Sequence, residues 1–381
     1  MRHKKPVIVF IINSLGLGGA ERALSNILQA TPKREEFDIH VVLLDTEKEN
    51  RVMPDFVTVH RLDSRRSLLR SIYLLSRTLA ALKPNLCVSL LVRSNVANVI
   101  VNRLFNRRPA IICERMHLSS HLALQFNGLK LTISKLIPKL IYRFASQALG
   151  VSTGVTSDLV NNFNVPKART LTIFNPYNHG QIYQDGDKNN ELSLPRQYIV
   201  AVGRLTKSKN FSDLIKGYCG SQCPYDLVIL GDGDKHEREH LQVRIDQSGL
   251  SDKVHLAGYA KNPFSVMKSA EFYISASLNE GFPNAMLEAM VLGLPVVASN
   301  CESGPAEILA NDDELQISSM YPAKYGLLVP TKSVASLTAA INEMSKVETQ
   351  LHYRQMALLR SKDFEIHKIA NEYWQNFRSF M

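Results

Sequence analysis

Residues 270–299 read AEFYISASLNEGFPNAMLEAMVLGLPVVAS and contain a complete strand, helix and strand. The apolar run AEFYISA leads into a short polar loop, a helix begins near Pro283, and a second apolar run, LPVVAS, follows the helix. Proline suits the first turn of a helix, where its missing N–H would have no partner. Two apolar strands joined by a helix are parallel neighbours in a sheet that helices cover on both faces. This stretch therefore predicts an α/β fold.

Strand-length apolar runs alternate with helix-length segments along almost the whole chain. The runs in the first half are PVIVFII, FDIHVVLL, NLCVSLL, AIICE, QALGVS and TLTIF, and those in the second half are YIVAVG, DLVILG, KVHLAG, AEFYISA, LPVVAS and YGLLVP. A chain of 381 residues is too long for one ordinary core. We therefore predict two Rossmann-like, doubly wound parallel-sheet domains.

The boundary between the two series lies near Asn175-Pro176, where a polar stretch rich in turn residues begins. The predicted organisation is an N-terminal domain at 1–175, a linker at 176–197, a C-terminal domain at 198–360 and a helical tail at 361–381. The tail either caps the second domain or crosses back to the first.

Charge is divided unevenly between the two halves. The chain has 45 Lys and Arg against 35 Asp and Glu, a formal charge of +10, and residues 1–175 hold 25 of the basic and 11 of the acidic residues. The N-terminal half thus carries +14 and the remainder −4. A basic balance indicates an anionic partner, and nucleic acid, anionic lipid and phosphorylated substrates all fit it. With 45% hydrophobic and 21% charged residues, the composition excludes a disordered chain.

Five cysteines without metal-site spacing or a disulfide framework indicate a reduced, cytoplasmic compartment. The apolar run at 7–12 is short, and a glycine loop follows it where a signal peptide would have its cleavage site. No apolar stretch approaches the ~20 residues that span a bilayer. We therefore expect a cytoplasmic protein that is soluble or bound to a membrane surface.

A glycine-rich loop at 13–22 joins the first strand to a helix and contains Gly16, Gly18 and Gly19. Such a loop presents backbone N–H groups and a positive helix end to an anion. A dinucleotide fingerprint, GxGxxG, would need its third glycine at another offset, and an acid after the second strand, for which Asp45 is the only candidate. A tight turn that packs the helix on the strand explains the loop equally well.

A second loop of this kind, GRLTKSKN at 203–210, follows the run YIVAVG. It places Arg204 and Lys209 at the carboxyl end of a strand, where open α/β sheets bind ligands. Two fixed cations at such a position can hold a diphosphate and neutralise it as it leaves. A solvated basic loop is the alternative.

Two glutamates flank the helix start near Pro283. Glu280 is in the loop before the helix, and Glu288 is about a turn and a half inside it. One carboxylate can reach hydroxyls of a ligand at the helix N-terminus while the other reaches further along the same ligand, and the backbone N–H groups of 281–284 can hold an anion between them. A capping carboxylate and an unrelated surface acid would have the same spacing.

Five motifs, in this order and spacing, resemble those of the retaining glycosyltransferases of family 4: GLGGAER, GRLTKSKN, LVILGDGD, VHLAGY and EGFPNAMLEAMVLGLPVVAS. The resemblance covers nearly the whole chain and is most specific in the last motif. It implies the GT-B architecture, in which two Rossmann-like domains face a cleft. It also implies a nucleotide-sugar donor, which we expect to be a UDP-sugar, and no metal ion or other cofactor.

The resemblance also assigns roles to single positions. Glu280 would lie beside the donor sugar, Glu288 would bind the ribose hydroxyls, and Arg204 and Lys209 would hold the diphosphate. His117, in ICERMHLSS, lies in the region where related enzymes place a histidine that faces the donor sugar. We take His117, Glu280, Arg204 and Lys209 as the candidate catalytic residues. Further contacts to the nucleotide sugar are expected from Gly18, Gly19, Gly203, Gly231, Tyr259, Gly281, Phe282, Pro283, Asn284 and Leu287.

Three other charged residues lie in or near these motifs. Arg115, which forms a cluster with Glu114 and His117, is a second candidate for a phosphate contact. Asp232 and Asp234 in LGDGD have the spacing of a metal-binding pair, but the family pattern places this segment near the nucleotide as a turn.

The segment FNGLKLTISKLIPKLIYR at 126–143 places apolar residues at helical spacing, with three lysines and an arginine among them. A basic amphipathic helix of this kind binds the headgroup region of an anionic membrane. Its alternative is a core helix with a solvated basic face, which Pro138 kinks or divides. Nucleic acid is disfavoured as a partner because no recognised binding module or aromatic platform accompanies the charge.

Together these features predict a cytoplasmic hexosyltransferase, peripheral on the inner face of the cytoplasmic membrane, that retains anomeric configuration. We expect it to move a hexose or N-acetylhexosamine from a UDP-sugar to a polyprenyl-diphosphate-linked glycan in bacterial surface polysaccharide synthesis. The alternatives are a lipopolysaccharide-core glycosyltransferase, a sugar-nucleotide epimerase on the same architecture, and a non-catalytic binding module.

Overall fold

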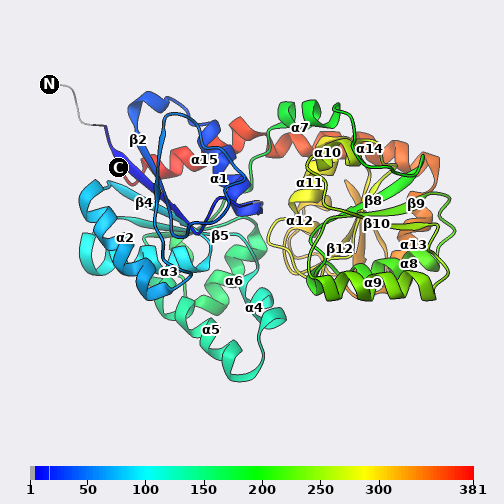
Figure 1. The fold of residues 1–381 in the computed structure, drawn as a ribbon, viewed down its shortest axis with the longest axis horizontal. Coiled ribbons are helices and arrows are strands. Elements are labelled where there is room, and N and C mark those ends of the chain that lie inside the picture. The colour runs from blue at the N-terminus through cyan, green and yellow to red at the C-terminus, as the bar shows by residue number, and fades with distance from the viewer. Residues whose placement is uncertain (1–4, 17) are drawn as a thin grey trace. The chain divides into compact units, whose positions relative to one another are not determined.

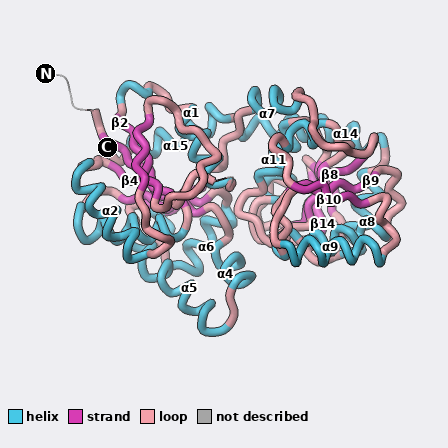
Figure 2. The backbone as a smooth tube through the Cα atoms, viewed as in Figure 1, coloured by secondary structure: helices cyan, strands magenta, loops and turns pink. Residues whose placement is uncertain are grey.

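The computed structural model describes residues 5–16 and 18–381, and the chain forms two compact units. The first unit comprises Met1–Tyr177 and Ile366–Met381, and the second comprises Asn178–Glu365. In each unit a seven-stranded sheet lies at the centre and helices surround it (Figure 1; Figure 2).

The first sheet has the strand order β3-β2-β1-β4-β5-β6-β7, and all its neighbouring strands are parallel. Its strands are β1 (Val7–Ile12), β2 (Asp38–Leu43), β3 (Val57–Arg61), β4 (Leu86–Leu90), β5 (Ala110–Glu114), β6 (Gln147–Gly150) and β7 (Thr170–Thr172). The helices of this unit are α1 (Gly19–Gln29), α2 (Leu68–Leu82), α3 (Val92–Val101), α4 (Leu118–Gln125), α5 (Gly128–Ile141), α6 (Thr153–Phe163) and α15 (Ile366–Arg378). Central strands such as β1 are buried at every position, which is why their sequences are continuously apolar.

Strand β3 is absent from the sequence prediction. It lies at the edge of the sheet, and of its five residues only Val57 is buried. An edge strand with little covered surface needs no continuous apolar run, so the pattern that reveals the central strands is missing here.

Helix α15 belongs to the first unit although it ends the chain. The rings of Trp374 and Phe377 pack edge-on against Phe10 of β1, with centroids 6.2 and 5.7 Å apart, and the Trp374 indole N–H donates to the Ile27 carbonyl at 3.2 Å. Figure 1 shows α15, in red, beside α1, in blue. The tail thus crosses to the first unit, and the crossing begins at Ile366 rather than at residue 361.

The segment predicted as a linker, 176–197, contains helix α7 (His179–Gly186), and from Asn178 onward it is part of the second unit. Asn178 caps this helix, which packs against α10, and Asn262 Nδ2 donates to the Asp185 carbonyl at 2.6 Å. Most of the predicted linker is therefore part of the second unit. An eight-residue helix is too short to show a clear apolar period in the sequence.

The second sheet has the order β10-β9-β8-β11-β12-β14-β13, and only the β13 and β14 pair is antiparallel. Its strands are β8 (Tyr198–Val202), β9 (Asp226–Leu230), β10 (Val254–Gly258), β11 (Tyr273–Ser275), β12 (Val296–Asn300), β13 (Tyr321–Ala323) and β14 (Gly326–Pro330). Its helices besides α7 are α8 (Phe211–Cys219), α9 (Lys235–Gln247), α10 (Pro263–Lys268), α11 (Asn284–Val291), α12 (Pro305–Leu309), α13 (Val334–Met344) and α14 (Val347–Ser361). The predicted fold class is confirmed, with one unpredicted antiparallel edge strand.

In both sheets the strand order reverses beside the first strand of the unit. Strand β1 lies between β2 and β4, and β8 lies between β9 and β11. Open α/β sheets bind ligands at the carboxyl ends of the strands at such a switch point. The loops after β1 and β4, and those after β8 and β11, are therefore the places to examine for a site.

Candidate active site

Two residues predicted to bind a donor meet at the switch point of the second sheet. Lys209 ends a 3₁₀ turn, Lys207–Lys209, that follows β8, and Glu280 lies in the loop after β11. Lys209 Nζ donates to Glu280 Oε1 at 2.5 Å, and the two side chains are 26% and 13% exposed. The Leu278 backbone N–H donates to the Ser208 carbonyl at 2.8 Å and ties the two loops together. This half-buried pair offers a cation to an anionic ligand and a carboxylate to hydroxyl groups.

Gly203 and Gly231 bring the ends of β8 and β9 into close contact. Gly231 has a φ of +144°, and a Cβ there would lie 2.0 Å from the Gly203 carbonyl oxygen, so only glycine fits. A Cβ at Gly203 would lie 3.1 Å from Cε of Lys209. The Lys209 side chain therefore passes directly over Gly203 on its way to Glu280.

Arg204 and Tyr259 are exposed at the same edge of the sheet. Arg204 follows the end of β8, and Tyr259, which is 55% exposed, follows the end of β10. Their side chains are accessible to a ligand bound at the carboxyl ends of these strands.

Helix α11 begins at Asn284 with Pro283 as its N-cap residue, so the predicted start is right to one residue. Glu288, on this helix, is 4% exposed, and Phe282 and Leu287 are 3% and 1% exposed. Phe282 and Leu287 are predicted contacts of the nucleotide sugar, but because their side chains are buried they can offer a ligand only backbone groups.

The loop that carries Glu280 is held from the interior of the second unit. The Ser303 hydroxyl donates to the Gly281 carbonyl at 2.8 Å, and the ring of Phe282 packs edge-on against Phe364 at 5.6 Å between centroids. These contacts fix the loop on its inner side, so that Glu280 is presented at the strand end.

The Glu280 carboxylate acts on two buried ionisable groups. Burial raises the pKa of the Cys301 thiol to about 12, and the negative charge of Glu280 adds to that effect. Burial, followed by the same charge, also raises the pKa of the Tyr273 phenol. Burial and this charge therefore favour the neutral thiol of Cys301 and the neutral phenol of Tyr273, which are weaker nucleophiles than their anions.

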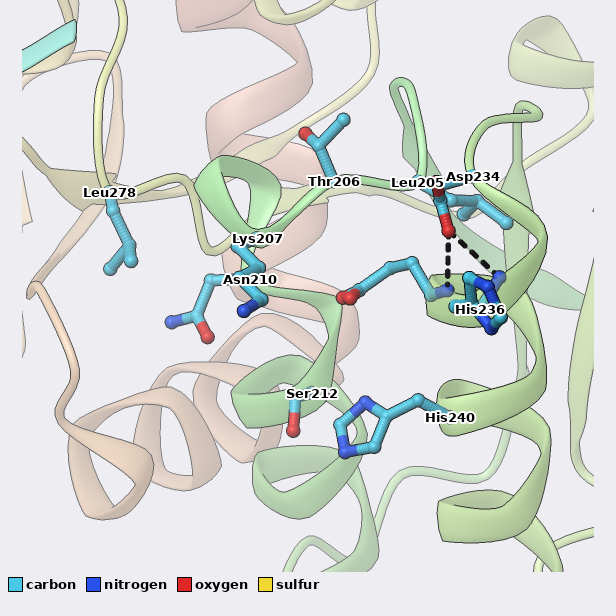
Figure 3. A pocket seen from close by; sticks show the side chains of 10 residues that line it. Leu205, Thr206, Lys207, Asn210, Ser212, Asp234, His236, His240 and Leu278 are labelled. Atoms are coloured by element: carbon cyan, nitrogen blue, oxygen red, sulfur yellow. Dashed lines mark hydrogen bonds between the residues drawn. The ribbon is translucent and has the colours of Figure 1, made fainter. Parts of the chain in front are cut away.

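A cavity of about 780 Å³ adjoins the loops that carry Lys209 and Glu280 (Figure 3). Its walls come from the turn and loop before α8, the start of α8, the start of α9, and the loop after β11. The lining residues are Leu205, Thr206, Lys207, Asn210, Ser212, Asp234, His236, Glu237, His240 and Leu278. In Figure 3 the imidazole of His240 points toward Ser212. Charged, polar and apolar side chains all line this cavity.

The two aspartates of LGDGD make backbone contacts. The Asp234 carboxylate caps α9 by accepting from the backbone N–H groups of His236 at 2.8 Å and Glu237 at 3.4 Å (Figure 3). The Asp232 carboxylate accepts from the Gly233 N–H at 2.8 Å. Within residues 5–16 and 18–381, no group of three or more His, Cys, Asp or Glu side chains is placed to hold a metal ion.

In the first unit, Gly18 is the N-cap residue of α1, and Gly19 is the first residue of that helix. A Cβ at Gly18 would lie 2.2 Å from Glu21 Oε2, so the Glu21 carboxylate folds back over the start of the helix. This carboxylate occupies the place that the sequence predicts for an anion, at the positive end of the helix. A ligand phosphate at this loop has to compete with Glu21.

Asp45, the candidate acid of a dinucleotide fingerprint, is engaged in a buried cluster. It accepts hydrogen bonds from the Ser64 hydroxyl at 2.7 Å, from the Arg66 backbone N–H at 3.0 Å and from the Arg93 guanidinium. Burial opposes ionisation of this carboxyl, but the hydrogen bonds prevail and lower its pKa to about 2. Asp45 is therefore already engaged by protein groups, which argues against its binding a ribose hydroxyl in a dinucleotide site.

His117 lies at the carboxyl end of the first sheet, where β5 leads into α4. It is the N-cap residue of α4, its Nδ1 is 2.9 Å from Ser120 Oγ, and its Nε2 is 3.9 Å from Asp158 Oδ1. The side chain is 12% exposed. The imidazole is thus oriented between a hydroxyl and a buried carboxylate.

The buried carboxyl group near His117 is that of Asp158, which sequence reasoning missed altogether, and a second buried carboxyl, Glu114, lies three residues before His117 in the chain. Asp158, from α6, accepts from the Ser119 backbone N–H at 2.9 Å, and Glu114 accepts from the Tyr142 hydroxyl at 3.0 Å. Burial raises the pKa of Glu114 to about 7, and the charge of Asp158 acts in the same direction. Asp158 lies in no motif, and the sequence signal is only a polar residue on an otherwise apolar helix face.

Arg115 points into the first unit. Its Nη1 donates to Asn175 Oδ1 at 2.9 Å and to the Tyr373 hydroxyl at 3.0 Å, and the residue is 8% exposed. The guanidinium links the loop after β5 to α15, which argues against its use as a phosphate contact.

Helix α5 covers most of the segment predicted as a basic amphipathic helix. Of its fourteen residues only Pro138 is buried, which contradicts the alternative of a core helix. Among the residues that the structure describes, no helix is both long and apolar enough to cross a membrane.

The predicted site residues thus fall into two sets. Gly18, Gly19 and His117 lie in the first unit, and the other predicted residues lie in the second unit at the carboxyl ends of β8, β9, β10 and β11. The structure brings Lys209, Gly203 and Glu280 into direct contact and leaves Arg204 and Tyr259 exposed nearby on the same sheet edge.

Comparisons with known proteins find similarity to glycosyltransferases. Residues 184–357 match the family model described as glycosyl transferases group 1. A relative from Campylobacter jejuni subsp. jejuni, N-acetylgalactosamine-N,N'-diacetylbacillosaminyl-diphospho-undecaprenol 4-alpha-N-acetylgalactosaminyltransferase, is 29% identical over 371 residues, which are 95% of this chain and 96% of the relative. A second relative from that organism, GalNAc-alpha-(1->4)-GalNAc-alpha-(1->3)-diNAcBac-PP-undecaprenol alpha-1,4-N-acetyl-D-galactosaminyltransferase, is 25% identical over 96% of each chain.

Solved structures show the same fold. Anabaena HepE in complex with UDP and glucose superposes with a TM-score of 0.77 at 20% identity, over 98% of this chain and 100% of that chain. The chain therefore has the GT-B fold, and residues 184–357, in its second unit, are similar to the glycosyl transferases of group 1. Its assignment to family 4 stays a prediction.

Proposed function

We propose that the protein is a retaining, metal-independent hexosyltransferase that moves a hexose or N-acetylhexosamine from a UDP-sugar to a polyprenyl-diphosphate-linked glycan in bacterial surface polysaccharide synthesis. The observation that carries this proposal is the Lys209–Glu280 pair at the switch point of the second sheet. It combines a cation for a diphosphate with a carboxylate for sugar hydroxyls where sheets of this kind bind ligands. The two Campylobacter relatives, named for undecaprenol-linked glycans, support the acceptor class.

In this proposal the donor lies across the carboxyl edge of the second sheet. Arg204 and Lys209 bind its diphosphate, the backbone N–H groups at the start of α11 add positive potential, and Glu288 binds the ribose. Glu280 accepts hydrogen bonds from the sugar once Lys209 has turned toward the phosphate. Donor binding thus replaces the ion pair between Lys209 and Glu280 with one between Lys209 and the diphosphate. Lys209 therefore never becomes an unpaired, half-buried charge.

Transfer takes place on the front face of the sugar. The acceptor oxygen forms a bond to C1 as the bond from C1 to the β-phosphate oxygen breaks, and the acceptor hydroxyl proton passes to the leaving phosphate. Arg204 and Lys209 stabilise the charge that develops on the diphosphate. This route needs no enzymic nucleophile, in agreement with the neutral Cys301 and Tyr273 near Glu280. His117 contacts the donor sugar, and Asp158 orients its ring.

A lipid-linked acceptor places the reaction at a membrane, which we propose is the inner face of the cytoplasmic membrane. The charge of +14 on residues 1–175 supports an anionic lipid surface as the partner of the first unit. The net charge of −4 on residues 176–381, most of which form the second unit, fits a unit whose few essential cations lie at the donor site.

A donor screen by thermal unfolding tests the donor site. UDP-, GDP- and ADP-sugars are added at increasing concentration, with and without EDTA. A ligand that binds only the folded state stabilises it, by about 2.7 kcal/mol at 100 times its Kd, so a UDP-sugar should raise the Tm equally in both conditions. The absence of a shift with every nucleotide sugar and free nucleotide would overturn the proposal.

Product analysis separates a transferase from its alternatives. With the donor found in the screen and a polyprenyl-diphosphate-linked glycan, mass spectrometry should show an elongated glycan, and NMR should show retained anomeric configuration. A changed sugar formed without acceptor would identify an epimerase. Donor binding without any product from a panel of lipid-linked and lipopolysaccharide-core acceptors would identify a binding module.

A further inference from the structure

The cavity shown in Figure 3 is lined by the starts of two helices of the second unit. Ser212 comes from the first turn of α8, and Glu237 and His240 come from the first two turns of α9. Two leucines, Leu205 and Leu278, add apolar surface. Of the described residues that line the cavity, none is among those assigned to the donor. The cavity is therefore available to a second ligand.

Backbone contacts hold the two leucines of the cavity in place. Leu205 continues the pairing of β8 with β9 beyond the strand ends, because its N–H donates to the Asp232 carbonyl at 3.1 Å. A Cβ at Gly233 would lie 2.5 Å from the Leu205 carbonyl oxygen, so these two segments are in close contact. The Leu278 N–H donates to the Ser208 carbonyl at 2.8 Å. The apolar surface of the cavity is thus fixed by the same loops that carry the donor-site residues.

Three polar side chains of the lining have unused hydrogen-bonding capacity. In the part of the chain that the structure describes, the side chains of Ser212, Glu237 and His240 make no hydrogen bond or ion pair with protein groups. Asp234, by contrast, is engaged as the cap of α9. Figure 3 shows the His240 imidazole pointing toward Ser212, so that groups from α8 and α9 face the same space. A hydroxyl, a carboxylate and an imidazole can together both donate to a ligand and accept from it.

The charge of the lining disfavours an anionic ligand. One lysine, Lys207, stands against two carboxylates, Asp234 and Glu237, which gives a formal charge of −1 with neutral histidines. A phosphate or a nucleotide would meet net repulsion, and a simple cation would leave the hydroxyl and leucine surfaces unused. A carbohydrate uses every part of the lining, because its hydroxyls donate to a carboxylate and exchange hydrogen bonds with serine and histidine, while its C–H groups pack on leucine.

The cavity adjoins the place where the sugar would be transferred. Leu278 precedes Glu280 by two residues, and two residues span at most about 7 Å of chain. A ligand against Leu278 is therefore close to the carboxylate that contacts the donor sugar in our proposal. The volume of about 780 Å³ falls within the range of about 300–1,000 Å³ that is usual for small-molecule sites. Since a glycosyltransferase has two carbohydrate substrates and the donor sugar lies at Glu280, the cavity is left for the acceptor.

We propose that the cavity between the starts of α8 and α9 is a carbohydrate subsite that binds a sugar residue of the acceptor glycan, with Ser212, Glu237 and His240 as its polar contacts. The second unit then recognises part of the acceptor as well as the donor. The identity of this sugar as part of the acceptor rests on the proposed function, but binding of a carbohydrate in the cavity is measurable without donor or lipid-linked acceptor.

NMR of the full chain labelled with ¹³C-histidine tests carbohydrate binding, with the His240 signal assigned by its loss in His240→Ala. The probes are the methyl α-glycosides of glucose, galactose, N-acetylglucosamine and N-acetylgalactosamine. At least one should shift the His240 signal, and Glu237→Ala should bind it about tenfold more weakly or worse. Glu239→Ala, on the same helix and 58% exposed in the native protein, is the matched control and should bind normally. An unmoved His240 signal with all four glycosides, or an equal shift with inorganic phosphate, would overturn the subsite.

Transfer kinetics identify the substrate that supplies the sugar. Glu237→Ala and His240→Ala should each raise KM for the acceptor by about tenfold and leave KM for the donor unchanged, whereas Glu239→Ala should change neither. A rise in KM for the donor in place of the acceptor, or equal values in Glu237→Ala and Glu239→Ala, would overturn the assignment to the acceptor. A nucleotide-sugar thermal shift on the same variants shows that they are folded. Its absence in the native protein would refute the proposed function, while the glycoside titration would still decide whether the cavity binds carbohydrate.

Discussion

The two sheets share the order of their central strands, but they treat charged residues at the strand ends differently. In the second unit Arg204 is exposed and the Lys209–Glu280 pair is half-buried. In the first unit Asp45 and Glu114 are 6% and 2% exposed, and each is enclosed in a hydrogen-bonded cluster. Strand order therefore predicts where a site can form, but the helices and loops that cover a strand end decide whether a ligand can reach it.

The largest effect is expected on turnover in the second unit. Lys209→Ala removes the cation that the accessible site offers to the diphosphate, and transfer should fall by about 10²–10³-fold. The measurement is kcat/KM with the donor found by thermal shift. Lys207→Ala, from the same turn, is the matched control and should retain nearly full activity. Equal losses in the two variants would mean that the turn as a whole, and not the contact with Glu280, is required.

The close packing of the strand ends in the second unit should be sensitive to one methyl group. Gly231→Ala places a Cβ 2.0 Å from a carbonyl oxygen at a φ of +144°, and we expect a loss of about 3 kcal/mol or more in the free energy of unfolding. Gly249→Ala, at a φ of +66° with no neighbour within 4 Å, should lose only about 1 kcal/mol. Urea unfolding measures both, and similar losses would contradict the close approach of β8 and β9.

Glu114, one of the two enclosed acids of the first unit, should make the free energy of unfolding depend on pH. The folded-state pKa of Glu114, about 7, lies above its ordinary value of 4.5, so the folded chain holds a proton that the unfolded chain releases. Its contribution is therefore complete below pH 4.5 and declines up to pH 7, by up to about 3 kcal/mol. Glu114→Gln should lack this decline when urea unfolding is compared at pH 5 and pH 8. A decline as large as that of the native protein would show that other groups cause it.

The smallest effect concerns His60 on the edge strand β3. Burial, followed by the charge of His40, lowers its pKa below the ordinary 6.5, so stability should be lost as the pH falls through 6.5. His60→Gln should reduce the difference in Tm between pH 8 and pH 5.5. The matched control is His236→Gln in the second unit, whose native side chain is 93% exposed, and it should leave that difference unchanged. A similar change in both variants would contradict an effect of burial at β3.

How much of the fold was predictable depends on how completely each element is buried. Strands such as β1 are covered on both faces and appear in the sequence as continuous apolar runs. Strands β3 and β13 have one buried residue each, and α7 is only eight residues long, so none of them leaves such a run. Helix α15 was visible as a helix, but its place in the first unit depends on Trp374 and Phe377 meeting Phe10 at the other end of the chain.

The candidate site was predictable to the extent that its residues follow strand ends. Lys209 and Glu280 are 71 residues apart, yet both follow apolar runs that become neighbouring strands, and neighbouring parallel strands bring their carboxyl ends together. Asp158 and Tyr142 lie in helices, where no comparable rule relates sequence position to a shared site. Their contacts with His117 and Glu114 appear only in the folded structure.

By itself the sequence determined the α/β class of this protein, its two parallel sheets, the strand-end positions of Arg204, Lys209 and Glu280, and the basic amphipathic character of α5. These features depend on local pattern. A strand that is buried on both faces is continuously apolar in sequence, and residues that directly follow parallel strands lie at the same edge of the sheet. Tertiary structure alone decided that the tail completes the first unit, that Glu21 covers the start of α1, and that His117 lies beside the buried carboxylate of Asp158. Those features depend on contacts between segments that are far apart in the sequence. Such contacts form only when the folded chain packs these segments together and excludes water from between them.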